Sequence, residues 1–245
     1  MMNKKMKILL AMGAMAAVVL ASGCGGDAKS GESAAKSGSG IPKVIRVGSA
    51  DAVIKQMGSQ MEFKSMGFDA LIPAVQSGQI DLIAAGLDAT PEREKQVAFS
   101  DPYFTQNGYI IIVRKDNDDI KDWADLEGKN VGAQVGTQQV KLAQEAKAAQ
   151  VKQLDSNSQA FMELQAKTLD AVVIDQPVGM YYLKQGGDKD LKIVGTSKGA
   201  NGMVFAVKKE NKELQAAVNK ALKEIKANGT YDKIFEKWFG KQEKK

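Results

Sequence analysis

The stretch AVQSGQIDLIAAGLD, residues 74–88, decides the fold. It reads as the end of a helix, a turn at Gly78, and a buried strand whose last residues include Gly86 and Asp88. A second stretch, ELQAKTLDAVVIDQP at 163–177, repeats this order and places Asp175 where the first has Gly86. Any two helix–turn–strand units share such a pattern, so the repeat alone leaves chance similarity open. If it is real, both strand ends meet at a shared cleft, where α/β folds bind ligands.

The surrounding sequence continues the alternation of short β-rich runs with helical patterns. The predicted strands are 44–49, 61–65, 80–86 and 170–175, apolar enough on both faces to favour parallel sheets. The predicted helices are 68–78 with Asp69 as N-cap, 137–149, 158–167, one with its apolar face ending before Gly229, and 231–239. This alternation predicts the α/β class.

Composition excludes several kinds of chemistry. The chain of 245 residues is 44% hydrophobic, has no histidine, and has a single cysteine, Cys24. Nucleophile pairs that need histidine, disulfides and most zinc sites are therefore excluded, and we expect no cofactor. Subtracting the three leader lysines from the net charge of +5 leaves +2, too little for binding nucleic acid.

The N-terminus predicts export. Residues 1–23 combine a basic start with a 13-residue apolar run, too short to span a bilayer, which is typical of a signal peptide. LASGC, ending at Cys24, resembles the bacterial lipobox, although Ala21 stands where that box prefers Leu. The resemblance implies lipidation of Cys24 and an extracytoplasmic protein anchored to a membrane. Residues 24–42 then form a Gly/Ser-rich linker with a reach of roughly 20–25 Å.

Three clusters of polar residues lie where predicted strands end. In GLDATPER, Asp88 offers carboxylate oxygens and Arg93 a planar fork for a carboxylate; alternatively, Thr90 only caps a helix and Arg93 is solvated. In VGAQVGTQQV, a helix opens at Gly136–Thr137, and its free N–H groups favour an anion. Asp175 ends a buried run and needs a cationic or N–H partner, unless it only caps the next helix.

Together the clusters complement an α-amino-acid zwitterion. One arginine and helix N–H groups suit the carboxylate, and two aspartates suit the ammonium group. Charge-assisted hydrogen bonds of about 1.5–3 kcal/mol each are compatible with micromolar binding after association costs.

Several of these motifs resemble one known family. MGFDALIPAVQSGQIDLIAAGLDATPEREKQVAFSDPYF, GKNVGAQVGTQQ, DAVVIDQP and NGTYDKIFEKWF are similar to the family 3 extracellular solute-binding proteins of polar amino-acid ABC transporters, over about 43–239. The resemblance implies a two-lobed, type II periplasmic-binding-protein-like fold, each lobe a mostly parallel sheet flanked by helices. It implies delivery of an amino acid to a membrane permease.

The resemblance also implies residue roles. Arg93 would clamp the ligand α-carboxylate, assisted by Thr137 and the Gln138 N–H group. Asp175, Asp88 and the Gly86 carbonyl would hold the α-amino group, although many relatives carry Ser or Thr at the position of Asp88. Phe63 and Phe68 match positions that line the side-chain pocket; both could instead be core residues. These are the ligand-binding candidates, with no catalytic or metal residue among them.

The resemblance further implies discontinuous lobes. Residues 43–105 and 198–242 would form lobe 1, and 106–197 lobe 2, with chain crossings near 105–108 and 196–201 as the hinge. Closure would then require ligand contacts from both lobes.

One segment departs from the family pattern. VGSADAVIKQMGSQMEFKSM, residues 47–66, lacks on the order of two dozen residues after the first strand. A parallel crossover needs at least ~10–12 residues, and only 50–60 are available. We interpret residues 51–58 as the end of a helix whose start, with one wall of the ligand pocket, is missing; this predicts weaker or broader binding.

Three functions remain open on the sequence. The leading one is the amino-acid-binding lipoprotein of an ABC importer. The second is a degenerate or non-transporting surface lipoprotein, which the shortened segment favours. The third is a cleft enzyme of the dehydratase type, disfavoured by the lack of histidine.

Overall fold

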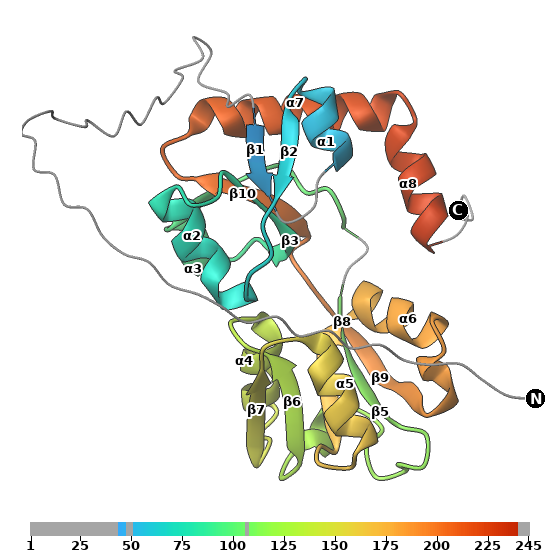
Figure 1. The fold of residues 1–245 in the computed structure, drawn as a ribbon. Coiled ribbons are helices and arrows are strands. Elements are labelled where there is room, and N and C mark those ends of the chain that lie inside the picture. Colours follow the sequence, from blue (N-terminus) through green and yellow to red (C-terminus); the bar gives the residue numbers. More distant parts are fainter. Residues whose placement is uncertain (1–43, 48–50, 106–107, 240–245) are drawn as a thin grey trace, which may run out of the picture. The chain divides into compact units, whose positions relative to one another are not determined.

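The computed structural model describes residues 44–47, 51–105 and 108–239 (Figure 1). The predicted signal peptide, Cys24 and the linker to residue 42 lie outside the described residues, as do 106–107 of the first predicted crossing. The chain forms two five-stranded sheets.

The first sheet has the order β2-β1-β3-β10-β4 and the second the order β7-β6-β8-β5-β9. The strands of the first sheet are β1 (Val44–Val47), β2 (Gln60–Phe63), β3 (Leu82–Asp88), β4 (Val97–Phe99) and β10 (Met203–Lys208). Those of the second are β5 (Gly108–Arg114), β6 (Asn130–Gln134), β7 (Gln150–Leu154), β8 (Ala171–Asp175) and β9 (Leu191–Gly199).

The two sheets repeat one topology, so the sequence repeat is structural. In each, the first three strands pair in parallel and the fourth pairs antiparallel with both neighbours. β3 and β8 hold the same central place. Four of the five strands in each sheet therefore run in the same direction, as predicted, and the sheets are mixed because β10 and β5, which enter after the chain has left the other sheet, run in the opposite direction.

Helices cover both faces of each sheet. The helices of the first sheet are α1 (Asp51–Gln56), α2 (Leu71–Ser77), α3 (Pro91–Glu94), α7 (Lys212–Ala227) and α8 (Thr230–Phe239). Those of the second are α4 (Gln138–Glu145), α5 (Asn157–Gln165) and α6 (Gln176–Lys184). Short 3-10 turns are η1 (Phe68–Ala70), η2 (Trp123–Leu126) and η3 (Gly187–Lys189).

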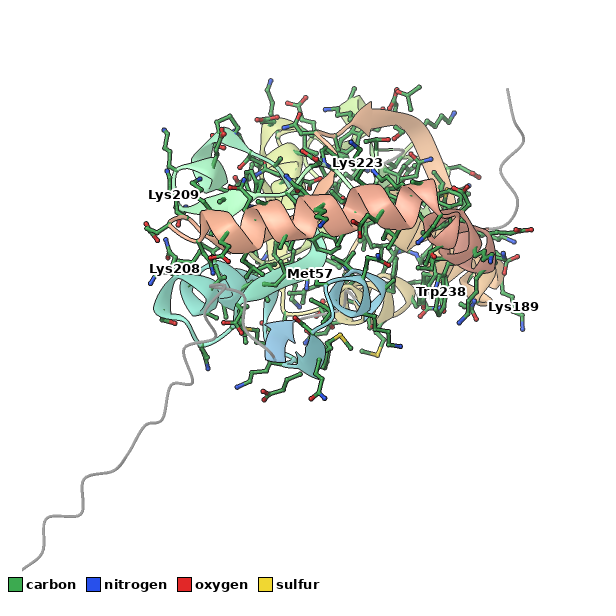
Figure 2. All side chains as sticks on the ribbon, turned by 90° about the horizontal axis from the view of Figure 1, so that it is seen from above. Met57, Lys189, Lys208, Lys209, Lys223 and Trp238 are labelled. Atoms are coloured by element: carbon green, nitrogen blue, oxygen red, sulfur yellow. The ribbon has the colours of Figure 1, made fainter. Side chains whose placement is uncertain are left out.

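The core of the first sheet has two halves. On one face, the apolar stripe of α7 and residues Val53 and Ile54 of α1 pack on Leu82 and Phe205. Seen from above, α7 runs beside α1, with Met57 alongside (Figure 2). On the other face, α2 packs on Ile83 and its neighbours. Burying these aliphatic side chains contributes about 1.5–3 kcal/mol each.

Three local predictions have clear outcomes. Gly229 follows α7 with a φ of 75°, the left-handed conformation expected of a helix C-terminal glycine. Asp69 as an N-cap was wrong: η1 intervenes, α2 begins at Leu71, and its N-cap Ala70 makes no side-chain bond. Burial of the 61–65 strand on both faces was also wrong. All four residues of β2 are exposed, because β2 is an edge strand beside a six-residue helix.

The short 47–66 segment still forms a complete crossover. β1 and β2 pair in parallel through four residues each, with α1 between them. At ~1.5 Å per residue, α1 is only about 9 Å long. No helix within the described residues is long and apolar enough to cross a bilayer.

Candidate functional site

Arg93 is the buried cation of the site. Thr90 caps α3 by accepting a hydrogen bond from the Arg93 N–H at 3.3 Å, and this turn directs the Arg93 side chain inward. Its side chain is 7% exposed, so the solvated-helix interpretation of Arg93 was wrong. One guanidinium nitrogen, Nη1, donates to the Asp88 carbonyl at 3.0 Å, and Nη2 donates to the Gly136 carbonyl at 3.0 Å.

The Arg93 guanidinium group therefore donates to two neutral carbonyl oxygens and also contacts the aromatic ring of Phe68. The Phe68 ring centroid lies 5.5 Å from Arg93 Cζ, a cation–π distance. Burial lowers the pKa of Arg93, and the carboxylates of Asp88 and Asp175 oppose that shift. A planar cation held by carbonyl groups remains able to bind a carboxylate in a bidentate manner.

Asp88 ends β3 and is 4% exposed. Its Oδ2 accepts a hydrogen bond at 2.8 Å from the hydroxyl of Tyr109, the second residue of β5. Burial and the nearby Asp88 charge raise the pKa of Tyr109, so the phenol stays protonated and can donate. This bond links a residue of the first sheet to a residue of the second.

The helix start predicted at Gly136–Thr137 is present. Gly136 has a φ of 75° and is exposed; a Cβ there would lie 3.0 Å from the Asp69 Cβ, so only glycine fits without displacement. Thr137 is the N-cap of α4, but its hydroxyl donates to the Gln134 carbonyl at 2.6 Å instead of capping. The first N–H groups of α4, including that of Gln138, thus lack a side-chain cap from Thr137 and favour an anion.

Asp175 is held by Gln139, which is not among the predicted site residues. Gln139, 4% exposed, donates from Nε2 to Asp175 Oδ2 at 2.6 Å. Asp175 sits at the N-cap position of α6 but makes no side-chain cap bond, so the capping interpretation was wrong. Its other oxygen, Oδ1, and Gln139 Oε1 are both buried, and neither has a hydrogen-bond partner among the residues that the structure describes.

The Asp175 carboxyl group titrates close to neutral pH. Burial, followed by the charge of Asp88, raises the pKa of Asp175 to about 7, while the Gln139 hydrogen bond and Arg93 oppose the rise. Burial likewise raises the pKa of Tyr103 to about 12, which keeps this neighbouring phenol neutral. The buried Asp175 carboxylate, whose Oδ1 accepts no hydrogen bond from the described residues, would be stabilised by a cationic donor.

The structure brings some of the predicted site residues together and leaves Phe63 apart. Gly86 lies in β3 with a φ of 66°, in the same strand as Asp88. Phe68 is half-buried and reaches Arg93. Phe63, in contrast, is 57% exposed on β2, and no contact that the structure records joins it to the other candidates.

Two functional candidates were missed. Tyr109 opens the apolar run GYIIIVR, and its partner Asp88 is 21 residues away. Gln139 shares the buried face of α4 with Ala143, four residues later. That spacing was a usable signal, because an amide on a buried helix face requires a hydrogen-bond partner.

The arrangement supplies one buried cation and two acidic side chains at strand ends. Acceptor oxygens at Asp175 and Gln139, with donors at Arg93 and α4, can bind a molecule carrying both charges. Within 44–47, 51–105 and 108–239, no cluster of acidic or cysteine side chains could hold a metal ion. The site therefore suits electrostatic binding of a small zwitterion.

Comparison with known proteins defines the class to which this fold and site belong. The family model described as bacterial extracellular solute-binding proteins, family 3, matches residues 37–241. The chain belongs to this family. Its fold is that of the type II periplasmic binding proteins, and two of the solved structures that it resembles cover 82% and 80% of this chain.

Three individual similarities are informative. ABC transporter arginine-binding protein 1 of Escherichia coli K12 is 38% identical over 195 residues, which cover 78% of this chain and 79% of that protein. The solved structure of an ancestral arginine-binding protein bound to glutamine has a TM-score of 0.77 at 42% identity, and the match covers 82% of this chain and 100% of that one. An ancestral amino-acid-binding protein described as a precursor of cyclohexadienyl dehydratase has a TM-score of 0.73 at 36% identity. The match covers 80% of this chain and 96% of that one.

Proposed function

We propose that this protein binds an amino acid and delivers it to the permease of an ABC importer. The observation that carries the proposal is the pair of buried, unpartnered oxygens, Asp175 Oδ1 and Gln139 Oε1, near the buried Arg93. An α-ammonium group would satisfy both oxygens. The relatives named as amino-acid-binding proteins support the same class of ligand.

In this proposal, Arg93 binds the ligand carboxylate. The Thr137 hydroxyl and the Gln138 N–H group lie at the start of α4, where an anion is favoured. Asp175, Asp88 and the Gly86 carbonyl receive the ammonium group, and Gln139 and Tyr109 hold the two carboxylates in place. Phe68 lies beside Arg93 and lines the ligand side-chain pocket, whereas Phe63, 57% exposed on β2, is assigned to that pocket by the resemblance alone.

We further propose that the two sheets belong to two lobes, as the resemblance implies, with the expected boundary at 197/198 moved to 199/200 because Lys198 and Gly199 pair with β5 in the second sheet. β9 ends at Gly199, so the second crossing would fall within 200–202, just before β10. Ligand groups on both sheets, Arg93 with Asp88 and α4 with Asp175, are consistent with binding that draws the two lobes together.

The short α1 bears on specificity. A six-residue helix leaves β2 exposed, consistent with a pocket wall that is absent relative to the family pattern. We expect weaker or broader amino-acid binding as a result. Calorimetric titration with the twenty amino acids tests this, and tight binding of a single one would contradict it.

Membrane anchoring through Cys24 is part of the proposal. Cleavage of 1–23 and lipidation would hold the protein outside the cytoplasm on the 24–42 linker. Metabolic labelling with a radioactive fatty acid should mark the wild type and leave Cys24→Ala unlabelled. Label retained in that variant would refute anchoring at this residue.

Transport is tested in cells. A strain lacking the protein should lose uptake of the radiolabelled amino acid that it binds, and the wild-type gene should restore the uptake. Unchanged uptake would favour a non-transporting surface lipoprotein. We propose no enzymatic role, although Asp175 has the raised pKa of an acid catalyst; water loss from a cyclic hydroxy acid in the presence of the protein would overturn this.

A further inference from the structure

The outer edge of the first sheet is unusually open. β2 is the terminal strand and pairs only with β1 among the strands that the structure describes. All four of its residues are exposed. The N–H and C=O groups on the free side of such a strand can pair with another strand.

Two apolar side chains lie uncovered on one face of β2. Phe63 and Leu82 both pair in register with the backbone of Val47, so the Phe63 and Leu82 side chains lie on the same face of the sheet. Leu82 packs under α1 and α7, which places Phe63, and Met61 two residues earlier, on that same face. The six-residue helix α1 contacts β2 but leaves both side chains partly uncovered: Phe63 is 57% exposed and Met61 38% exposed.

The opposite face of this edge carries one acid and one base. Glu62 lies on β2, and Lys64 follows it two residues later, with Nζ 3.7 Å from the Glu62 carboxylate. Both side chains remain accessible, at 53% and 36%. Charges on edge strands usually discourage pairing, but charges of opposite sign at this spacing favour one partner.

That partner is a second copy of β2 extended by Lys64 and Ser65, the two residues that follow its last residue, Phe63. In an antiparallel pair centred on Phe63, Glu62 of each copy lies opposite Lys64 of the other, twice by symmetry. The two Phe63 rings face each other, and Met61 lies opposite Ser65. Centring the pair on Glu62 instead would oppose two like charges, and centring it on Met61 would leave both charges without an opposite charge, so the charges favour the register centred on Phe63.

We propose that β2 mediates self-association of this protein by antiparallel pairing centred on Phe63. The pairing joins two five-stranded sheets into one continuous sheet and covers the apolar face that α1 leaves exposed. The contact is short, so association is weak and concentration-dependent. It goes beyond ligand binding, because Glu62 and Lys64 are not ligand-binding candidates and Phe63, which is one by resemblance, is 57% exposed on β2.

Charge exchange tests the register directly. Sedimentation velocity of the full chain in mild detergent, over a wide range of concentrations, should show a reversible dimer for the wild type. Glu62→Lys and Lys64→Glu should each be monomeric alone, because each opposes like charges. Mixed in equal amounts, the two variants should form a heterodimer, since every charge then meets its opposite.

Matched measurements separate this contact from others. Lys223→Glu reverses an exposed charge on α7 (Figure 2) and should leave the dimer unchanged. Amino-acid binding should be equal in all three variants. A wild type that stays monomeric, variants that associate as strongly as the wild type, or a mixture that stays monomeric would each overturn the proposal.

Discussion

Gln139 donates a hydrogen bond of 2.6 Å from Nε2 to Oδ2 of Asp175, 36 residues further along the chain, and leaves the second carboxylate oxygen unpartnered. The bond lowers the pKa of Asp175 against the effect of burial. It also fixes the direction in which the free oxygen points. Gln139 therefore acts on the ligand partly through Asp175.

Replacing Gln139 should weaken amino-acid binding at neutral pH. Gln139→Leu keeps the volume but removes the donor, so the pKa of Asp175 rises further and less of it is ionised. A hydrogen bond to a charged group contributes about 1.5–3 kcal/mol, which corresponds to a loss of roughly tenfold or more in affinity. Calorimetry should show that loss, and Gln144→Leu on the exposed face of α4 should not. Equal affinities would remove Gln139 from the site.

Binding should depend on pH through Asp175. Its pKa of about 7 in the free protein means that it must lose a proton before it can receive an ammonium group. Affinity should therefore fall about tenfold per pH unit as the pH drops below about 7, and level off above it. Titrations at neutral pH in buffers of different ionisation enthalpy should reveal proton release. An affinity that is flat from pH 5 to pH 8 would contradict this role.

Asp175 should cost the ligand-free protein stability at high pH. Its folded-state pKa is raised above the ordinary 3.8, so the folded state holds this proton more tightly than the unfolded state. That contribution to stability is complete below about pH 4 and is lost as the pH rises through about 7. Asp175→Asn should thus raise the melting temperature at pH 8 by about 2 °C or more while abolishing binding.

The matched control for this prediction is Asp188→Asn in the exposed turn η3, which should change neither quantity. A lower melting temperature for Asp175→Asn at pH 8 would show that the carboxylate is stabilising in the free protein.

Arg93→Lys should retain the fold and lose the ligand. The backbone N–H of Arg93, not its side chain, completes the α3 cap with Thr90, so the local turn survives. A lysine cannot make the planar, bidentate contact to a carboxylate. We expect at least a roughly hundredfold loss of affinity, from two charge-assisted bonds, with an unchanged circular dichroism spectrum. Arg114→Lys, whose side chain binds carbonyls of Leu164 and Leu169, should bind normally.

Much of the fold was predictable because it rests on local patterns. The buried strands β3 and β8 are continuous apolar runs, and each follows a helix and a left-handed residue, Gly78 or Lys167. The reversed direction of β5 and β10 was not predictable locally, since it depends on where the chain re-enters each sheet. The exposure of β2 follows from the length of α1 and from its place at the edge, neither of which the five-residue run encodes.

The site shows the same division. Arg93 and Asp175 were found because a charged residue at the end of a buried strand or start of a helix needs an explanation. Tyr109 and Gln139 were missed because their partners, Asp88 and Asp175, are distant in sequence. Only the fold brings these donors to the carboxylates.

The most direct test of amino-acid recognition uses ligands blocked at each charge. Calorimetric titration with the twenty amino acids identifies a binder, and the protein is then titrated with the N-acetyl form and the carboxamide of that binder. Because Asp175 receives the ammonium group and Arg93 the carboxylate, neither blocked form should bind measurably. Binding of the N-acetyl form as tight as that of the free amino acid would contradict the assignment of Asp175 and, with it, the proposed site.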